Sequence, residues 1–347
     1  MRRSVAVRGF TLVELLVSLA LAGLVVAGAL QLHIHFNSNA ERQREITEVQ
    51  QNLRVAMAIL ERNVRSAASG IPRGELRSEY GAGGVQRFYG FQFSNSNTYD
   101  DPKTTFDTTI GDSDTDPDWF RIVAADNSVA YGGRLPAGGT GRALEINSTT
   151  GWSIGDVVVV SPSAQTPCVR EVTGTASGTP PQLLLGASST NGFNPGGADD
   201  TCVKGMPSPM ALRRVPRRYT AFRIEPDAAN GGRVPRLQMR TASFGTSATA
   251  AAWTTIAEHI EDMQVAVILA SGQICGEVNA DTDNPASCDF SQAAAVRITL
   301  VARSSQRIPG VTDQIVGGYE DRPGVKVSDG LIRRALTTVI HLRNVVL

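Results

Sequence analysis

The chain has 347 residues, of which 41% are hydrophobic, a composition ordinary for a folded protein that excludes a disordered tract. Its 33 basic and 33 acidic residues give a formal net charge of zero, so no global field would draw the chain to nucleic acid or to an anionic surface. This length allows one large hydrophobic core or two modest ones.

The N-terminus combines a short basic segment with a long apolar one. Residues 1–9 carry three arginines and no acid, and an apolar stretch of 25 residues runs from Phe10 to Ile34. That is long enough to cross a bilayer core of about 30 Å as a helix. The basic flank should stay in the cytoplasm, which would export everything after the apolar stretch. We therefore predict a membrane-spanning helix over residues 10–36.

The predicted helix continues beyond the apolar stretch. Apolar residues recur at steps of three or four, as expected for one stripe of a helix: Ile46, Val49, Leu53, Met57, Leu60 and Val64. Gly70 and Pro72 form a stop signal. One helix from about Phe10 to Ala68 would be roughly 90 Å long. Residues 37–70 are then its exported, amphipathic half.

Residues 71–347 are rich in turns and predict a β-rich head. Short apolar runs alternate with glycine, serine, threonine and asparagine. Candidate strands are Arg87–Phe93, Trp119–Ala124, Ala143–Asn147, Asp156–Ser161, Val169–Thr173, Gln182–Leu185, Thr220–Glu225, Arg236–Thr241, a strand from Met263, Ala295–Arg303 and Thr337–Val345. Residues 99–205 are polar and glycine-rich, which suggests an inserted β subdomain. The expected fold class is α+β, with a long N-terminal helix and a C-terminal antiparallel β-rich head.

All four cysteines lie in the predicted exported part: Cys168, Cys202, Cys275 and Cys288. An even number of cysteines in an oxidising compartment indicates two disulfides, for which three connectivities exist. We favour the sequence-local pairs, Cys168 with Cys202 and Cys275 with Cys288. The alternative is a set of unpaired buried thiols.

The segment RGFTLVE, residues 8–14, followed by an apolar helix, closely resembles the class III signal of type IV prepilins and type II secretion pseudopilins. The resemblance implies that a membrane prepilin peptidase cuts after Gly9 and N-methylates Phe10. Glu14 corresponds to the acid that nearly all members of the family carry. An ordinary secretory signal with a cleavage site near Ala22 is the alternative, but an acid within the apolar core of such a signal is unfavourable.

Glu14 needs a partner, because an ionisable side chain at helix-centre depth in a membrane costs about 2.5–3.5 kcal/mol. Cleavage after Gly9 would create a cationic amine on Phe10, four positions before Glu14. The resemblance implies that Glu14 of an incoming subunit meets the terminal amine of a neighbour already in the filament. Two charges that are each costly in lipid can offset one another when the geometry is good. The pair would then set the axial register between packed helices.

The C-terminal sequence narrows the expectation. The segments IEDMQVAVIL, AAVRITLVARS and LTTVIHLRNVVL resemble the closing part of PilW-type minor pilins. The resemblance implies a minor pilin in the inner membrane, with its head in the periplasm, that later joins a pilus tip complex. Its partners would be other minor pilins, the major pilin, the inner-membrane assembly platform and membrane lipid. A J-type pseudopilin of type II secretion, or a tip subunit for adhesion or DNA uptake, is the alternative.

Two acidic clusters suggest calcium binding: Asp112, Asp114, Asp116 and Asp118, and Asn279, Asp281 and Asp283. An EF-hand frame starting at Asp112 fails, because its sixth position is Pro117 and its twelfth is Val123. We therefore interpret both clusters as solvated loops.

The segment ALRRVPRRY, residues 211–219, holds four arginines and could contact DNA phosphates, but we favour an exposed turn or subunit contact. The sequence contains no nucleophile elbow, phosphate-binding glycine loop or zinc-type cysteine spacing. It predicts no enzyme activity, cofactor or metal.

Overall fold

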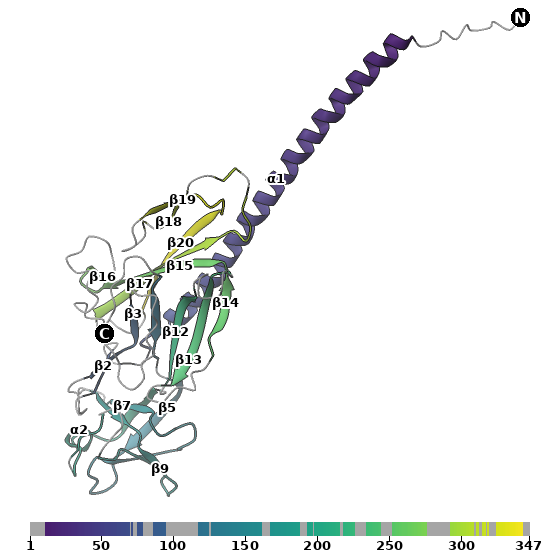
Figure 1. The fold of residues 1–347 in the computed structure, drawn as a ribbon. Coiled ribbons are helices and arrows are strands. Elements are labelled where there is room, and N and C mark those ends of the chain that lie inside the picture. Colours follow the sequence, from purple (N-terminus) through teal and green to yellow (C-terminus); the bar gives the residue numbers. More distant parts are fainter. Residues whose placement is uncertain are drawn as a thin grey trace, which may run out of the picture.

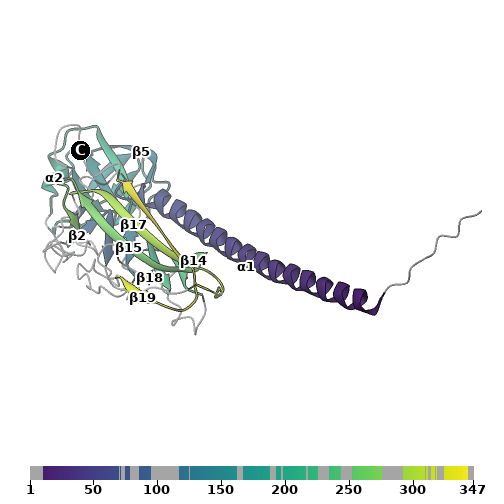
Figure 2. The ribbon, with the colours of Figure 1, turned by 90° about the horizontal axis from the view of Figure 1, so that it is seen from above.

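The computed structural model describes residues 11–69, 71, 75–78, 86–94, 117–124, 126–161, 167–187, 193–196, 198–215, 218–225, 234–243, 252–275, 292–308, 310–311, 314–316, 318 and 324–342. A long helix, α1 (Leu12–Val64), carries a β-rich head at its C-terminal half. Figure 1 and Figure 2 both show the N-terminal half of this helix projecting away from the head. The fold class is α+β with an antiparallel head, as predicted.

The C-terminal half of α1 buries the predicted stripe. Its buried residues are Val49, Leu53, Ala56, Met57, Leu60 and Val64. Ile46 is half-buried, because it lies where the helix leaves the head. The helix ends at Val64, four residues before the predicted end. Ala68 has a φ of 58°, a left-handed conformation that does not continue an α-helix.

Two antiparallel sheets build the core of the head. The first has the order β14 (Thr254–Glu258), β13 (Arg236–Ser243), β12 (Arg218–Glu225), β4 (Trp119–Ile122), β3 (Phe91–Ser94). The second has the order β16 (Ile274–Cys275), β15 (Ile260–Leu269), β17 (Ala293–Arg303), β20 (Arg333–His341). The helix packs on β14, β17 and β20, while β15 faces β4, β12 and β13. One apolar core therefore joins both sheets to α1.

Two short antiparallel pairs complete the main part of the head. They are β1 (Glu75–Ser78) with β2 (Gln86–Tyr89), and β18 (Gln314–Val316) with β19 (Val325–Val327). The structure also changes predicted strand boundaries. The predicted strand Arg87–Phe93 is two strands, β2 and β3, which belong to different sheets and are separated at Gly90. The second sheet's central hairpin begins at Ile260 rather than Met263, because Ile260 already pairs with Ala302 and is fully buried.

A third sheet is inserted between two paired strands of the first. β4 and β12 are hydrogen-bonded neighbours, and the chain between them forms a seven-stranded sheet. Its order is β8 (Cys168–Glu171), β7 (Val157–Ser161), β11 (Met210–Val215), β5 (Asp126–Arg134), β6 (Ala143–Ile146), β10 (Gln182–Leu184), β9 (Gly174–Ala176). These strands span residues 126–215, whereas the proposed insertion covered 99–205. Residues 95–116 lie outside the described residues.

The inserted sheet has apolar contacts on both faces. One face carries a core of its own that includes Leu144, Val158, Val160, Leu183 and Leu212. The other face packs Val157 and Val159 against the main part of the head, through Tyr219 and Ala221 of β12. The run of four valines in β7 is therefore buried on both sides, which explains why it does not alternate with polar residues. In Figure 1 this sheet and the short helix α2 (Thr201–Lys204) lie at the end of the head furthest from the projecting helix.

The helix end is fixed by a close approach that requires glycine. The amide of Ala68 donates to Val123 O at 2.9 Å, and the amide of Val123 donates to Gly90 O at 2.8 Å. A Cβ added at Gly90 would lie 2.4 Å from the Cα of Ala68, a distance that backbone atoms cannot accept without moving.

We expect Gly90→Ala to lower the free energy of unfolding by about 1–3 kcal/mol, the usual range for forced overpacking. Urea unfolding of the full chain in detergent micelles measures the loss. Gly132→Ala is the matched control, because nothing lies within 4 Å of a Cβ there. Equal stability of the two variants would contradict the proposed contact.

Candidate functional site

The apolar half of α1 is uncovered. Every side chain from Thr11 to Arg44 is exposed, from Leu12 at 75% to Phe36 at 68% for the large apolar residues at its two ends. This helix is long and apolar enough to cross a membrane, and the head buries none of its most apolar stretch. Such a surface requires lipid or other apolar helices around it.

Glu14 lies in the first turn of α1 and closes a capping box with Thr11. The Thr11 hydroxyl accepts a hydrogen bond from the Glu14 amide at 3.3 Å. The Glu14 carboxylate accepts from the Thr11 amide at 3.1 Å and from its hydroxyl at 2.9 Å. Two donors at the helix start are thus satisfied within the chain, and the acid lies at the positive end of the helix dipole. This local role was not among the predictions from the sequence, although the Thr-x-x-Glu spacing could have revealed it.

The predicted processing residues, Gly9 and Phe10, lie outside the described residues. The N-cap is Thr11, so an amine on Phe10 would directly precede the capping box.

Hydrogen bonds between Glu45 and Ser305 connect the helix to the head. Glu45, four residues before the first buried residue of α1, accepts hydrogen bonds from the Ser305 amide at 2.9 Å and from its hydroxyl at 3.0 Å. Ser305 directly follows the central strand β17 through Ser304. These hydrogen bonds therefore join the helix to the sheet that covers it.

Arg333 forms a second polar cluster, next to the end of β17 that leads to Ser305. Its guanidinium donates to both carboxylate oxygens of Glu261, at 2.6 and 3.0 Å, and to both of Asp329, at 2.9 and 2.6 Å. Its backbone amide donates to Gln314 Oε1 at 2.7 Å. The hydrogen bonds to Arg333 lower the pKa of Asp329 to about 2. The two carboxylates raise the pKa of Arg333 against the opposing effect of its burial. This cluster links β15, β18 and β20.

We expect this cluster to make stability sensitive to acid. Asp329 has an ordinary pKa of 3.8 and a folded pKa of about 2, so its stabilisation is present above pH 4 and is lost as pH falls from about 4 to about 2. The contribution is about 1–2 kcal/mol, reduced from the full linkage value because the carboxylate is partly exposed. Arg333 stays charged over this window and adds no slope. Asp329→Asn should remove that part of the slope in urea unfolding between pH 5 and pH 2, and an unchanged slope would contradict it.

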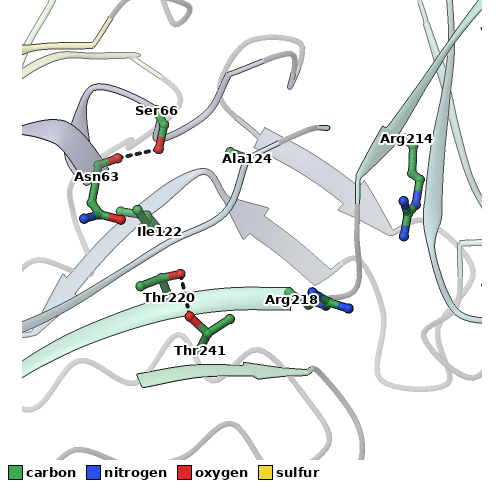
Figure 3. A pocket seen from close by; sticks show the side chains of 8 residues that line it. All are labelled: Asn63, Ser66, Ile122, Ala124, Arg214, Arg218, Thr220 and Thr241. Atoms are coloured by element: carbon green, nitrogen blue, oxygen red, sulfur yellow. Dashed lines mark hydrogen bonds between the residues drawn. The ribbon is translucent and has the colours of Figure 1, made fainter. Parts of the chain in front are cut away.

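A polar pocket of about 350 Å³ opens where the end of α1 meets the head and the inserted sheet (Figure 3). Its lining residues are Asn63, Ser66, Ile122, Ala124, Arg214, Arg218, Thr220 and Thr241. Arg214 is ion-paired with Asp156 at 2.7 Å, whereas Arg218 is exposed.

This arrangement corrects the interpretation of the arginine-rich segment. Arg213 and Arg214 belong to β11, an interior strand of the inserted sheet rather than a turn. Arg213 is exposed, but Arg214 is neutralised by Asp156, and Arg217 lies outside the described residues. The described arginines of this segment therefore do not form one continuous basic patch for DNA phosphates.

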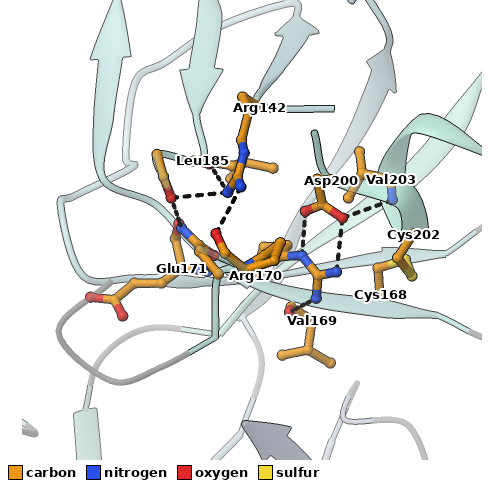
Figure 4. A network of polar contacts seen from close by, with 12 residues as sticks. Arg142, Cys168, Val169, Arg170, Glu171, Leu185, Asp200, Cys202 and Val203 are labelled. Carbon is orange, nitrogen blue, oxygen red and sulfur yellow. Dashed lines mark hydrogen bonds and ion pairs between the residues drawn. A yellow bond between two sulfur atoms is a disulfide. The ribbon is translucent and has the colours of Figure 1, made fainter. Parts of the chain in front are cut away.

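A disulfide and a buried ion pair stabilise the inserted sheet at its edge strand β8 (Figure 4). Cys168 and Cys202 form a disulfide with a Cα–Cα distance of 6.2 Å. Beside it, Arg170 is ion-paired with Asp200, and both side chains are buried. Asp200 also accepts from the Val203 amide at 3.2 Å, which caps the helix that carries Cys202. This is the sequence-local cysteine pair. Cys275 is disulfide-bonded as well, but its predicted partner Cys288 lies outside the described residues.

The acidic segment has one described member with a different role from the predicted one. Asp118 is buried, and its carboxylate accepts a hydrogen bond from the Val265 amide of β15. It therefore joins the two main sheets instead of lying in a solvated loop. Asp112, Asp114, Asp116, Asn279, Asp281 and Asp283 lie outside the described residues. No cluster of three or more metal-ligating side chains occurs among the residues that are described.

Comparisons with known proteins match the two ends of the chain. Residues 6–30 match the prokaryotic N-terminal methylation motif, and residues 221–344 match the family of type IV pilus-assembly protein W. Among solved structures, the type IV-like pilin TTHA1219 from Thermus thermophilus is similar at 14% identity and a TM-score of 0.25, covering 56% of this chain and 86% of that one. No curated protein sequence matches the chain. The two family-model matches indicate a structural rather than an enzymatic protein.

Proposed function

We propose that this type IV pilin-like chain, which carries a methylation motif and a PilW-type segment, is a minor pilin in the tip complex that primes pilus assembly. The observation that carries the proposal is the division of one unbroken helix into two halves. Its C-terminal half is built into the core of the head, while its N-terminal half exposes an apolar surface. That surface is suited first to the inner membrane and then to a bundle of similar helices.

The proposed assembly step is noncovalent. Prepilin peptidase would cut after Gly9 and leave a methylated amine on Phe10. In the bilayer, the Glu14 carboxylate of one subunit would pair with the amine of the next, because each charge is costly there without a partner. The requirement for that pair would select a single axial alignment of the packed helices.

The size of the head favours a place at the filament end. The inserted sheet adds residues 126–215 to a head that already contains two sheets. Bulk of this kind would obstruct repeated packing along a shaft but is tolerated at a tip. The head would lie in the periplasm before assembly, and it would contact other minor pilins and the major pilin.

Two measurements test this function. Mass spectrometry of the mature protein should find N-methylated Phe10 at the terminus, whereas a terminus at Gly23 would reject prepilin processing. Deletion of the gene should sharply reduce the number of surface pili, and re-expression of the intact chain should restore it. Normal pilus numbers combined with lost adhesion or DNA uptake would instead support a binding subunit, and defective protein secretion would support a pseudopilin.

A further inference from the structure

We propose that the pocket at the end of α1 binds a sugar acid, a hexose-sized ligand with one carboxylate. The pocket lies between the last turn of the helix, the ends of β4 and β11 and the first residues of β12 (Figure 3). Its volume of about 350 Å³ falls near the lower end of the range for small-molecule sites. That space exceeds what a bare inorganic anion needs.

The charges of the lining residues call for one anionic group. None of the eight lining residues is acidic, and two are arginines. Arg214 is offset by Asp156, so its charge is already matched within the fold. Arg218 is exposed and makes no ion pair with any described residue. One uncompensated guanidinium is therefore available, and its planar donors fit a carboxylate.

The other end of the pocket calls for hydroxyl donors. The Thr220 and Thr241 hydroxyls share one hydrogen bond at 3.2 Å, and the Ser66 hydroxyl donates to Asn63 O at 2.6 Å. The Asn63 amide nitrogen donates to Ile59 O at 2.8 Å, which leaves its side-chain oxygen as an acceptor. The C-terminus of α1 adds a partial negative charge here. This end would repel a second anion and accept hydrogen bonds from ligand hydroxyls.

The two ends together define the orientation of the ligand. In Figure 3 the arginines lie at one end of the pocket, and the hydroxyl and amide groups lie at the other. Ile122 and Ala124 add apolar lining, against which the C–H face of a sugar ring can pack. A sugar acid satisfies all three requirements, because it combines one carboxylate, several hydroxyls and an apolar ring face.

The proposal is tested by titrating the full chain in detergent micelles with three probes: glucuronate, glucose and acetate. Isothermal titration calorimetry should show glucuronate binding at least tenfold more tightly than either of the others, because each of these lacks one set of contacts. Absence of glucuronate binding at its solubility limit would overturn the proposal. Acetate that binds as tightly as glucuronate would also overturn it, since only an anion contact would then exist.

A pair of arginine variants locates the site. Arg218→Gln should weaken glucuronate binding about ten- to a hundredfold, the loss expected for one charge-assisted hydrogen-bonding group. Arg213→Gln is the matched control. Arg213 is an exposed arginine on the preceding strand, β11, and it does not line the pocket. Equal losses in both variants would mean nonspecific attraction and would overturn the site. Neither measurement depends on pilus assembly, so their outcome is independent of the proposed function.

Discussion

Glu14→Gln should reduce entry of this subunit into filaments by roughly 100-fold. The substitution leaves the neighbour's amine without a counter-charge in lipid, where an unpaired ionisable group costs about 2.5–3.5 kcal/mol. The start of the helix should survive, because glutamine at the third helical position also accepts from the Thr11 amide in a capping box. The change therefore tests the charge separately from the helix cap. Immunoblots of sheared pili, normalised to the membrane pool, measure the ratio.

Two further variants complete this test. Glu41→Gln is the matched control, because Glu41 is an exposed acid on the same helix outside the apolar stretch. It should enter filaments as the parent chain does. Thr11→Val removes the cap hydroxyl but keeps the acid, so it should have a smaller effect than Glu14→Gln. If Glu14→Gln enters filaments as efficiently as the parent, the electrostatic account of register is wrong.

Phe120→Ala should remove about 3–5 kcal/mol from the free energy of unfolding, because it empties the centre of the main core. Phe120 is fully buried on β4, with its ring centroid 5.4 Å from that of Phe91 and 4.9 Å from that of Phe222. The substitution therefore removes two aromatic contacts as well as apolar area. A loss of this size is a large fraction of the stability of a typical domain. Urea unfolding of the full chain in detergent micelles, followed by circular dichroism, measures it.

Phe120→Leu provides the graded comparison, because it keeps much of the apolar volume and loses only the ring stacking. It should be less destabilising than Phe120→Ala. Leu183→Ala makes a corresponding cavity in the core of the inserted sheet, where Leu183 is fully buried. A loss below about 1 kcal/mol for Phe120→Ala would show that the ring stack contributes little to the head.

Much of the architecture could be predicted from local patterns. The apolar stretch and the stripe from Ile46 to Val64 predicted one helix with two different surfaces, and that division is present, with burial beginning at Val49. The candidate strand Ala295–Arg303 is present within β17, and its alternate residues Val296, Ile298 and Leu300 face the core. These predictions succeed because side-chain direction follows a fixed period of 3.6 residues in a helix and two in a strand.

Some candidate site residues could be identified from the sequence, and others could not. The prepilin-like signal around Glu14 can be recognised in the sequence because its residues are contiguous. The arginine-rich segment was interpreted as an exposed turn or subunit contact, but Arg213 and Arg214 lie in a strand. Its composition does not reveal that Arg214 meets Asp156, 58 residues away, directly before the neighbouring strand β7. Asp118 was grouped with its acidic neighbours, whereas its partner is the Val265 amide, 147 residues away.

The sequence by itself determined the long two-surfaced helix, the acid in its first turn and the antiparallel character of the head, because each follows from the spacing of residues close together in the chain. Only the tertiary structure decided that β4 and β12 pair across an inserted sheet, that Gly90 must admit the backbone of Ala68, and that Arg333 joins two carboxylates. The physical reason is that a local period fixes the direction of a side chain but not its partner. Partners are chosen when distant segments pack into a shared core, where apolar burial and the pairing of buried polar groups must be satisfied together.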